Sequence, residues 1–383
     1  MAVIILYFSL FLGVHLLAKL FKNPAAARWF QLAACFALLF AFFGFRDITI
    51  LNDTSHYYGF YFQKAHILSY KQESVFVFHL TDKFEYGFQV LVHLLVKYVS
   101  TEPYTIILVS SFVITVGELW FIDKYYKDIA KVCFYMLVAG LFFMHYCIIR
   151  QAIAIMLFYV AFGYLVRRQY LKYCLLIVGA GLFHMSALFL LILPVVQNAN
   201  PSRKNTLIAL AIAVVLALSV FEILSILGLR EHPYYKAAVQ KDSLSLVGLA
   251  DLAFMGFTLF ACWYARQKAR MTTPDRLYYW ICVLALCVCL VAPVLYPVAR
   301  INEYLWPFII LHMLRYIDPQ AVKQSFVSTE DGVSGFLRIV VVAVFLAKMI
   351  GVNTFRPEWL HIEPYQFYDF EKAVHTYNIY PQQ

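Results

Sequence analysis

The sequence has few charged residues: Lys, Arg, Asp and Glu together make up 14% of its 383 residues. A soluble globular chain usually carries about 25% charged residues. Hydrophobic residues reach 63%, and the mean hydropathy is +0.72. This composition excludes a soluble domain, so we expect an all-α, polytopic membrane protein. At roughly 20 residues for each spanning helix, the length allows about 10–13 transmembrane or re-entrant helices. We expect them to form a single domain over residues 1–383.

Motifs for nucleotide and metal chemistry are also missing. The sequence has no Walker loop, no GxSxG and no dinucleotide fingerprint, and its His, Cys, Asp and Glu residues lack metal-ligand spacing. The eight cysteines all lie in apolar runs, which is typical of small buried side chains. We therefore expect no metal and no cofactor. The net charge of +9 does not indicate nucleic-acid binding, because the basic residues are spread near helix ends, where they set topology.

The N-terminal half predicts a long loop on the outer face. No basic residues precede the first apolar run, so residues 1–20 predict a transmembrane helix rather than a cleaved signal peptide. The basic connection that follows is expected to be cytoplasmic, so the second span, 30–45, delivers Arg46 to the outer face. Residues 46–103 then form an outer loop. Its apolar run 87–99 is too short to span and predicts a re-entrant or interfacial helix.

Two later runs are too long for one simple span. Residues 132–166 predict two short spans with a turn among residues 145–151. Residues 171–196 form either one long span or a broken helix that turns at 181–186. We favour the broken form, because it returns Arg203 to the cytoplasmic side and keeps the later loops in agreement with the charge rule.

The remaining apolar runs each predict one span. They are 104–122, 205–228, 247–265, 277–298, 304–316 and 336–352. This topology places an outer loop at 229–246, a basic cytoplasmic loop at 266–276 and the C-terminal tail outside.

Three arginines fall on the predicted outer face, against the positive-inside bias: Arg46, Arg150 and Arg300. A single arginine at a helix end is typical of a snorkelling interfacial residue. Three on one side are better explained by a shared anion, because guanidinium groups bind phosphate and pyrophosphate oxygens in a bidentate manner. The sequence therefore predicts an anion site at the outer edge of the membrane, since charged groups there are otherwise costly.

Other polar residues fall on the same predicted face. Asp53 is a candidate base or a residue that orients an arginine, with a turn cap as the alternative interpretation. His184 is a second candidate base, although a histidine in such a position is more often a hydrogen-bonded residue at a helix break. Tyrosines here are typical of an interfacial belt or of stacking on sugar rings. The residues that we expect to contact sugar are Tyr57, Gln151 and Tyr304.

A set of short motifs recurs in a fixed order along the chain. They are Arg46 with Asp53, Thr54 and Tyr57, EYGF at 85–88, IRQAIA at 149–154, FHMSAL at 183–188, Arg300 with Tyr304, and Pro364 with Tyr365. This order resembles the EpsG family of membrane polysaccharide polymerases, a branch of the Wzy-type O-antigen and exopolysaccharide polymerases. The resemblance covers nearly the whole chain. One position departs from the family's pattern, because Leu51 stands where the family often has glycine, two residues before the aspartate.

The resemblance implies a glycosyltransferase of the C-type membrane superfamily (GT-C) in the bacterial inner membrane, with its active site facing the periplasm. Such an enzyme moves a growing glycan from undecaprenyl diphosphate to the non-reducing end of a lipid-linked repeat unit. Its implied partners are the undecaprenyl-diphosphate-linked oligosaccharide, membrane lipid and a polysaccharide chain-length regulator.

On this reading, Arg46, Arg150 and Arg300 bind the carrier diphosphate. Together they stabilise the charge that builds on the leaving group, with Arg150 counted among the catalytic residues, and Asp53 or His184 acts as the base. The main alternative is a lipid-linked oligosaccharide flippase. A flippase commonly shows repeat-related halves and access from both faces, whereas here no repeat is visible and the polar candidates share one side. A membrane O-acyltransferase, using His184, is a further alternative.

Overall fold

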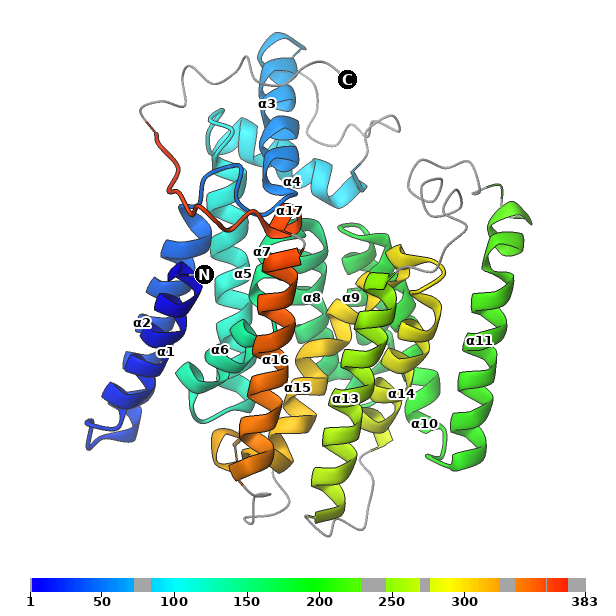
Figure 1. The fold of residues 1–383 in the computed structure, drawn as a ribbon. Coiled ribbons are helices and arrows are strands. Elements are labelled where there is room, and N and C mark those ends of the chain that lie inside the picture. Colours follow the sequence, from blue (N-terminus) through cyan, green and yellow to red (C-terminus); the bar gives the residue numbers. More distant parts are fainter. Residues whose placement is uncertain are drawn as a thin grey trace. The chain divides into compact units, whose positions relative to one another are not determined.

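The structure, a computed structural model, describes residues 2–71, 84–226, 228, 246–268, 276–323, 335–355 and 357–370 (Figure 1). Over these residues it is helical, with only isolated β-bridges besides the helices. In the described part, six helices are long and apolar enough to cross a membrane, or seven if one bent pair is a single span. Shorter apolar helices accompany them. The prediction of an all-α, polytopic membrane protein is confirmed.

The chain forms two compact units, which are described separately. Unit 1 comprises Met1–Trp120, Ile129–Ile153 and Met349–Gln383, and unit 2 comprises Phe121–Asp128 and Ala154–Lys348. The single domain over residues 1–383 stays a prediction. Residues 229–245 of the predicted outer loop 229–246 and most of the basic loop 266–276 lie outside the described residues, as does the tail beyond residue 370.

Unit 1 contains most of the N-terminal helices. They are α1 (Ala2–Ala18), α2 (Pro24–Gly44), α3 (Thr54–Lys71), α4 (Tyr86–Tyr98), most of α5 (Thr105–Tyr125), α6 (Ile129–Val138), α7 (Leu141–Cys147), the start of α8 (Ile149–Val166), the end of α16 (Gly335–Phe355) and α17 (Pro357–Leu360).

Helices α1 and α2 form a hairpin at the blue end of the chain (Figure 1). Helix α2 begins six residues before the predicted span 30–45. Asn23 caps it by accepting hydrogen bonds from the backbone N–H groups of Ala25 (2.9 Å) and Ala26 (3.4 Å), and Pro24 occupies the first turn. A capping Asn followed by Pro is a strong helix start, because the side chain satisfies orphan N–H groups and the proline needs no partner. The start of α2 is therefore readable in the sequence.

The segment 46–103 contains two helices. The predicted helix at 87–99 is present as α4, one residue earlier at each end. Its buried residues Phe88, Val92, Leu95 and Val96 recur at helical spacing and form one face. Helix α3, which the sequence analysis treated as loop, packs on α4. It contains many Tyr, His and other polar residues, so the sequence shows no long apolar run there. Its stability comes from this packing rather than from the segment itself.

The run 132–166 is broken twice. The predicted turn at 145–151 contains the break between α7 and α8 at Ile148. A further bend of 75° separates α6 from α7. Gly140, which has a φ of +83°, lies at this bend, where glycine adopts the left-handed conformation without a steric penalty.

Unit 2 contains the later helices. They are the ends of α5 and α8, then α9 (Tyr170–Gly181), the 3-10 helix η1 (Met185–Ile192), α10 (Leu193–Asn198), α11 (Arg203–Ile226), α13 (Leu246–Lys268), α14 (Arg276–Val291), the 3-10 helices η2 (Tyr296–Ile301) and η3 (Pro319–Ala321), α15 (Asn302–Ile317) and most of α16.

The run 171–196 is a broken hairpin, as favoured from the sequence. Helix α9 ends at Gly181, and η1 packs back against it. The side-chain amide of Asn198 donates to the Tyr170 hydroxyl oxygen (3.1 Å), so the two ends of the hairpin lie side by side. The Tyr173 hydroxyl donates to the carbonyl of Leu190 (2.7 Å) and ties the two arms together. A single long span is excluded by these contacts.

The core of unit 2 is built on α14 and α15. Helix α14 ends at Val291, seven residues before the predicted end of the span at 298, because Pro293 and Pro297 follow and cannot donate backbone hydrogen bonds. Helix α15 is almost entirely buried despite Pro307 in its interior. Helix α13 packs against both.

Candidate functional site

Arg46 lies inside unit 1 and is completely buried. Its Nε donates to Thr54 Oγ1 (3.1 Å), Nη1 donates to Ser111 Oγ (3.1 Å) and to the carbonyl of Phe43, and Nη2 donates to the carbonyl of Tyr146 (3.0 Å). These acceptors come from α2, α3, α5 and α7. One guanidinium group therefore joins four helices of unit 1.

The C-terminal segment covers the strand-like stretch around Arg46. The Asp47 N–H donates to the carbonyl of Gln366 (2.9 Å), and the Tyr368 N–H donates to that of Phe45 (2.9 Å). The Tyr104 hydroxyl lies between the carbonyls of Gly44 (2.8 Å) and Arg46 (2.7 Å). Burial lowers the pKa of Arg46, because a charged guanidinium loses its contact with water. The surrounding acceptors offset this cost in free energy.

Arg150 lies in the first turn of α8 and is only partly buried. The Arg150 cluster consists of Asp53, Tyr57, Phe84, Glu85 and Arg150. Arg150 Nη1 donates to the Glu85 carboxylate, and the two side chains are 19% and 18% exposed. The guanidinium lies 4.7 Å from the centroid of the Phe84 ring, a cation–π contact. Arg150 is therefore oriented by protein groups but still reaches the surface of the unit.

Tyr57 connects α3 to this arginine. Its side chain forms a hydrogen bond with Arg150, and its ring stacks on Phe84 at 5.8 Å. Burial raises the pKa of Tyr57 to about 12, and the nearby Asp53 also raises it while Arg150 lowers it. Tyr57 is thus neutral at physiological pH and keeps a hydroxyl proton. Asp53 is half-buried at the start of α3, close enough to act electrostatically on Tyr57.

The Arg150 cluster has capacity for an anion. Arg150 Nε is buried and makes no hydrogen bond within the described residues. The first turn of α8 contains no acidic residue, so the partial positive charge of the helix N-terminus is not neutralised from within. The adjacent Gln151 is buried. An anion here would gain from a guanidinium and a helix dipole together.

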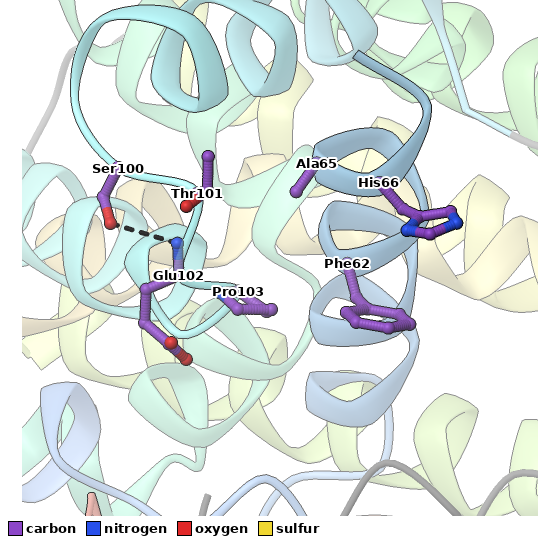
Figure 2. Close-up of a pocket in the computed structure, with 7 residues that line it drawn as sticks. All are labelled: Phe62, Ala65, His66, Ser100, Thr101, Glu102 and Pro103. Atoms are coloured by element: carbon purple, nitrogen blue, oxygen red, sulfur yellow. Dashed lines mark hydrogen bonds between the residues drawn. The ribbon is translucent and has the colours of Figure 1, made fainter. Parts of the chain in front are cut away.

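A polar hollow lies elsewhere on unit 1. Figure 2 shows Phe62 and His66 on α3 on one side of it, and the turn 100–103 on the other. Its volume is about 340 Å³. An exposed aromatic ring beside hydroxyl and carboxylate groups is the combination that binds sugars, since the ring stacks on C–H faces and the polar groups bind hydroxyls.

In unit 2 the remaining predicted residues lie on or next to the 3-10 helices η1 and η2. Helix η1 packs against η2, which carries Arg300. The hydroxyls of Ser186 and Tyr304 lie 3.2 Å apart, and Tyr304 is fully buried. His184 is the half-buried residue that precedes η1, where the chain is extended. The structure therefore brings together the segments of His184 and Arg300 in unit 2, and those of Arg46, Asp53, Tyr57, Arg150 and Gln151 in unit 1.

Comparison with known proteins identifies the family. A family model described as the EpsG family matches residues 29–367. The chain belongs to the EpsG family. No curated protein and no solved structure matches it. The family assignment makes it a membrane protein of the polysaccharide polymerase type.

The conformation of Leu51 explains how this chain departs from the EpsG-family pattern at a position where the family often has glycine. Leu51 has a φ of +61°, in the left-handed region where glycine is preferred. A non-glycine residue there costs about 1–2 kcal/mol. The Leu51 side chain is fully buried, and burying a leucine contributes about 1.5–3 kcal/mol. The turn before Asp53 therefore persists without glycine, because packing offsets the strain.

Two features of this EpsG-family protein escaped the sequence analysis. Glu85 and Phe84 position Arg150, although the motif EYGF was noted only for its resemblance. Glu118 and His145 form a fully buried pair, 2.5 Å between Oε1 and Nδ1. The signal for it was a glutamate inside the apolar run 104–122, since a carboxylate within a span needs a partner.

Proposed function

We propose that this protein is a polysaccharide polymerase of the GT-C type in the bacterial inner membrane. It transfers a growing glycan from undecaprenyl diphosphate to the non-reducing end of a lipid-linked repeat unit at the periplasmic face. The family supports the polymerase class. The observation that carries the chemical step is the partly exposed Arg150 in the first turn of α8, where the helix dipole also favours an anion.

The reaction requires charge stabilisation on a leaving group. The acceptor hydroxyl oxygen bonds to the anomeric carbon of the donor sugar, and the bond from that carbon to the carrier diphosphate breaks with its electron pair on the diphosphate. The hydroxyl proton passes to a base. Arg150 binds the diphosphate and stabilises the charge that develops there. Glu85 neutralises Arg150 while the site is empty, and the incoming diphosphate competes for the same guanidinium.

The acceptor side of the reaction belongs to the residues around Tyr57. Asp53 is the proposed base, and the neutral Tyr57 hydroxyl is a donor to a sugar oxygen. Gln151, whose side chain is buried, remains a sugar contact proposed from the sequence alone. The hollow between Phe62 and the turn 100–103 is suited to sugars farther along a glycan (Figure 2).

The burial of Arg46 revises the part that we propose for it. Its donors serve Thr54, Ser111 and two backbone carbonyls, so we now propose that it positions α3 and α7 rather than contacting the diphosphate itself. Arg300 as a diphosphate ligand, His184 as an alternative base and Tyr304 as a sugar contact remain proposals from the sequence. A chain-length regulator remains a proposed partner.

The test compares Arg150→Ala with Arg150→Lys in a strain that depends on this polymerase. Arg150→Ala should abolish long glycan and leave single repeat units on the carrier, because the guanidinium group that stabilises the leaving diphosphate is removed. Losing such a group typically costs about 10²–10³-fold in rate. Arg150→Lys should retain part of the activity, since it keeps the charge without the bidentate geometry.

The matched control is Arg203→Ala, at the exposed start of α11. It removes the same side chain outside the cluster and should leave glycan length unchanged at equal expression. Long glycan from Arg150→Ala at wild-type level would refute the proposed role. Purified protein in liposomes that moves lipid-linked repeats across the bilayer without lengthening them would favour the flippase.

A further inference from the structure

Unit 2 contains a cavity of about 580 Å³ with a strongly basic lining. Helix ends from α5, α8, α14 and α15 border it, together with α10. Its cationic side chains are Lys124, Arg167, Arg168, Arg276 and Arg315. None of the described residues that line it is acidic. The proposed polymerase chemistry makes no use of this cavity.

Aromatic rings hold several of these cations in place. Arg315 lies over the ring of Tyr278 at 5.2 Å, and Lys124 lies over that of Tyr125 at 5.3 Å. Arg167 Nε donates to the carbonyl of Gly163 (3.0 Å). These contacts limit the freedom of the side chains to turn away from one another. Protein contacts therefore hold Lys124, Arg167 and Arg315 beside the cavity.

Positive charges gathered around one cavity repel one another. At the distances typical of one cavity, this repulsion is appreciable wherever water is partly excluded. An anion in the cavity converts the repulsion into attraction. Phosphate suits this lining best, because guanidinium groups bind its oxygens in a bidentate manner and several donors can share its charge.

The lining also has an apolar part. Phe162, Val166 and Leu277 lie beside the cations, so the cavity joins a polar region to a hydrophobic one. A soluble phosphate would use only the polar region. A phospholipid would use both, with its headgroup phosphate among the cations and the upper part of its acyl chains along the apolar residues.

The predicted topology places this cavity at the cytoplasmic membrane surface. The charge rule assigns Lys124, Arg167, Arg276 and Arg315 to that side independently, from four separate loops. Their meeting at one cavity supports this assignment. Gln197, at the returning end of the broken hairpin, lines the same cavity and agrees with it. Anionic headgroups are the phosphates present at that depth and on that side.

We propose that this cavity binds the headgroup of an anionic phospholipid. The cavity shares no residue with the Arg150 cluster and does not depend on the proposed polymerase activity. The lipid would join the ends of α5, α8, α14 and α15 on one side of unit 2 and stabilise their packing.

The test uses the full-length protein, purified in detergent and titrated with phosphatidylglycerol, phosphatidylcholine or inorganic phosphate. Binding is read by native mass spectrometry and by the midpoint of thermal unfolding. The cavity variant is Arg168→Gln with Arg276→Gln, two exposed residues of the lining. The control is Arg203→Gln with Lys204→Gln, which removes two exposed charges from the same predicted side outside the cavity.

We expect phosphatidylglycerol, but not phosphatidylcholine, to bind and raise the unfolding midpoint. The cavity variant should lose roughly tenfold or more in affinity, because each cation near an anionic lipid surface contributes on the order of fivefold. The control should bind as the wild type does. Both variants should unfold at the wild-type midpoint in phosphatidylcholine, which shows that they are folded.

Three results would overturn the proposal. Equal losses in the cavity variant and the control would mean that overall charge, not the cavity, attracts the lipid. Equal binding of the two lipids would exclude recognition of the headgroup. Inorganic phosphate that binds and stabilises while phosphatidylglycerol does not would show a soluble anion site instead. A loss of glycan elongation has no bearing on these readouts, so the two proposals fail separately.

Discussion

Replacing Arg46 by lysine tests whether this arginine positions the helices around it or binds the substrate. The structure gives this guanidinium four acceptors in different directions, from Thr54, Ser111 and the carbonyls of Phe43 and Tyr146. A lysine ammonium keeps the charge but is a compact group on a flexible stem and cannot reproduce the planar fork. The variant therefore leaves buried acceptors without donors.

The size of the effect follows from the number of bonds lost. A hydrogen bond to a charged group contributes about 1.5–3 kcal/mol, so losing two of the four costs about 3–6 kcal/mol. In a chain of this size that corresponds to a drop in the unfolding midpoint on the order of 5 °C or more. Arg150→Ala should change the midpoint far less, because Arg150 is partly exposed and borders the surface of unit 1.

The assay is thermal unfolding in detergent, followed with a thiol-reactive fluorophore. The chain suits it, because its eight cysteines are free and most of them are buried. Elongation activity is measured on the same preparations. We expect Arg46→Lys to be unstable, and Arg150→Ala to be stable but inactive. An Arg46→Lys protein with wild-type stability and no activity would refute the positioning role and return Arg46 to the diphosphate site.

Two further predictions concern stability alone. Gly248→Ala should destabilise the protein by about 1–3 kcal/mol, because a Cβ there would lie 2.7 Å from backbone atoms of Ala292 and Pro293, which cannot move aside as a side chain would. The control, Gly256→Ala on the same helix, places its Cβ in open space and should be neutral or slightly stabilising. Equal unfolding midpoints for the two variants would contradict the close packing at Gly248. The pKa of Tyr57 is raised to about 12, from about 10 in an unfolded chain. The fold therefore favours the neutral phenol, so the contribution of Tyr57 to the free energy of unfolding is complete below about pH 10 and is lost as the pH rises towards 12. Tyr57→Phe should show a smaller fall in unfolding midpoint over this range than the wild type. Identical pH profiles would argue against the raised pKa.

The helix breaks show how far local sequence carries the fold. The start of α2 follows from Asn23 and Pro24, and the end of α14 follows from the prolines after it, because caps and prolines act within one helical turn. The broken form of the run 171–196 was favoured through the charge of the following loop, which is a constraint of the membrane rather than of the segment itself. Helix α3 was missed, because it is stabilised by packing on α4 and carries no long apolar run.

For the candidate site, too, some features are visible in the sequence and others only in the structure. Arginines on the wrong side of a predicted topology are visible in the sequence, since a charge near a bilayer is costly and needs a reason. Their different roles are not visible. Arg46 and Arg150 look alike along the chain, and only their neighbours make one of them fully buried and the other accessible.

Composition and charge by themselves determined that this is an α-helical, many-span membrane protein, because a bilayer admits long apolar helices and biases the placement of Lys and Arg. The order of short motifs determined its family. The tertiary structure decided which polar groups meet: Arg46 with four acceptors, Arg150 with Glu85 and Tyr57, and five cations around one cavity. Arg46 and Tyr146 are 100 positions apart, and distance along a chain carries no record of contact in space.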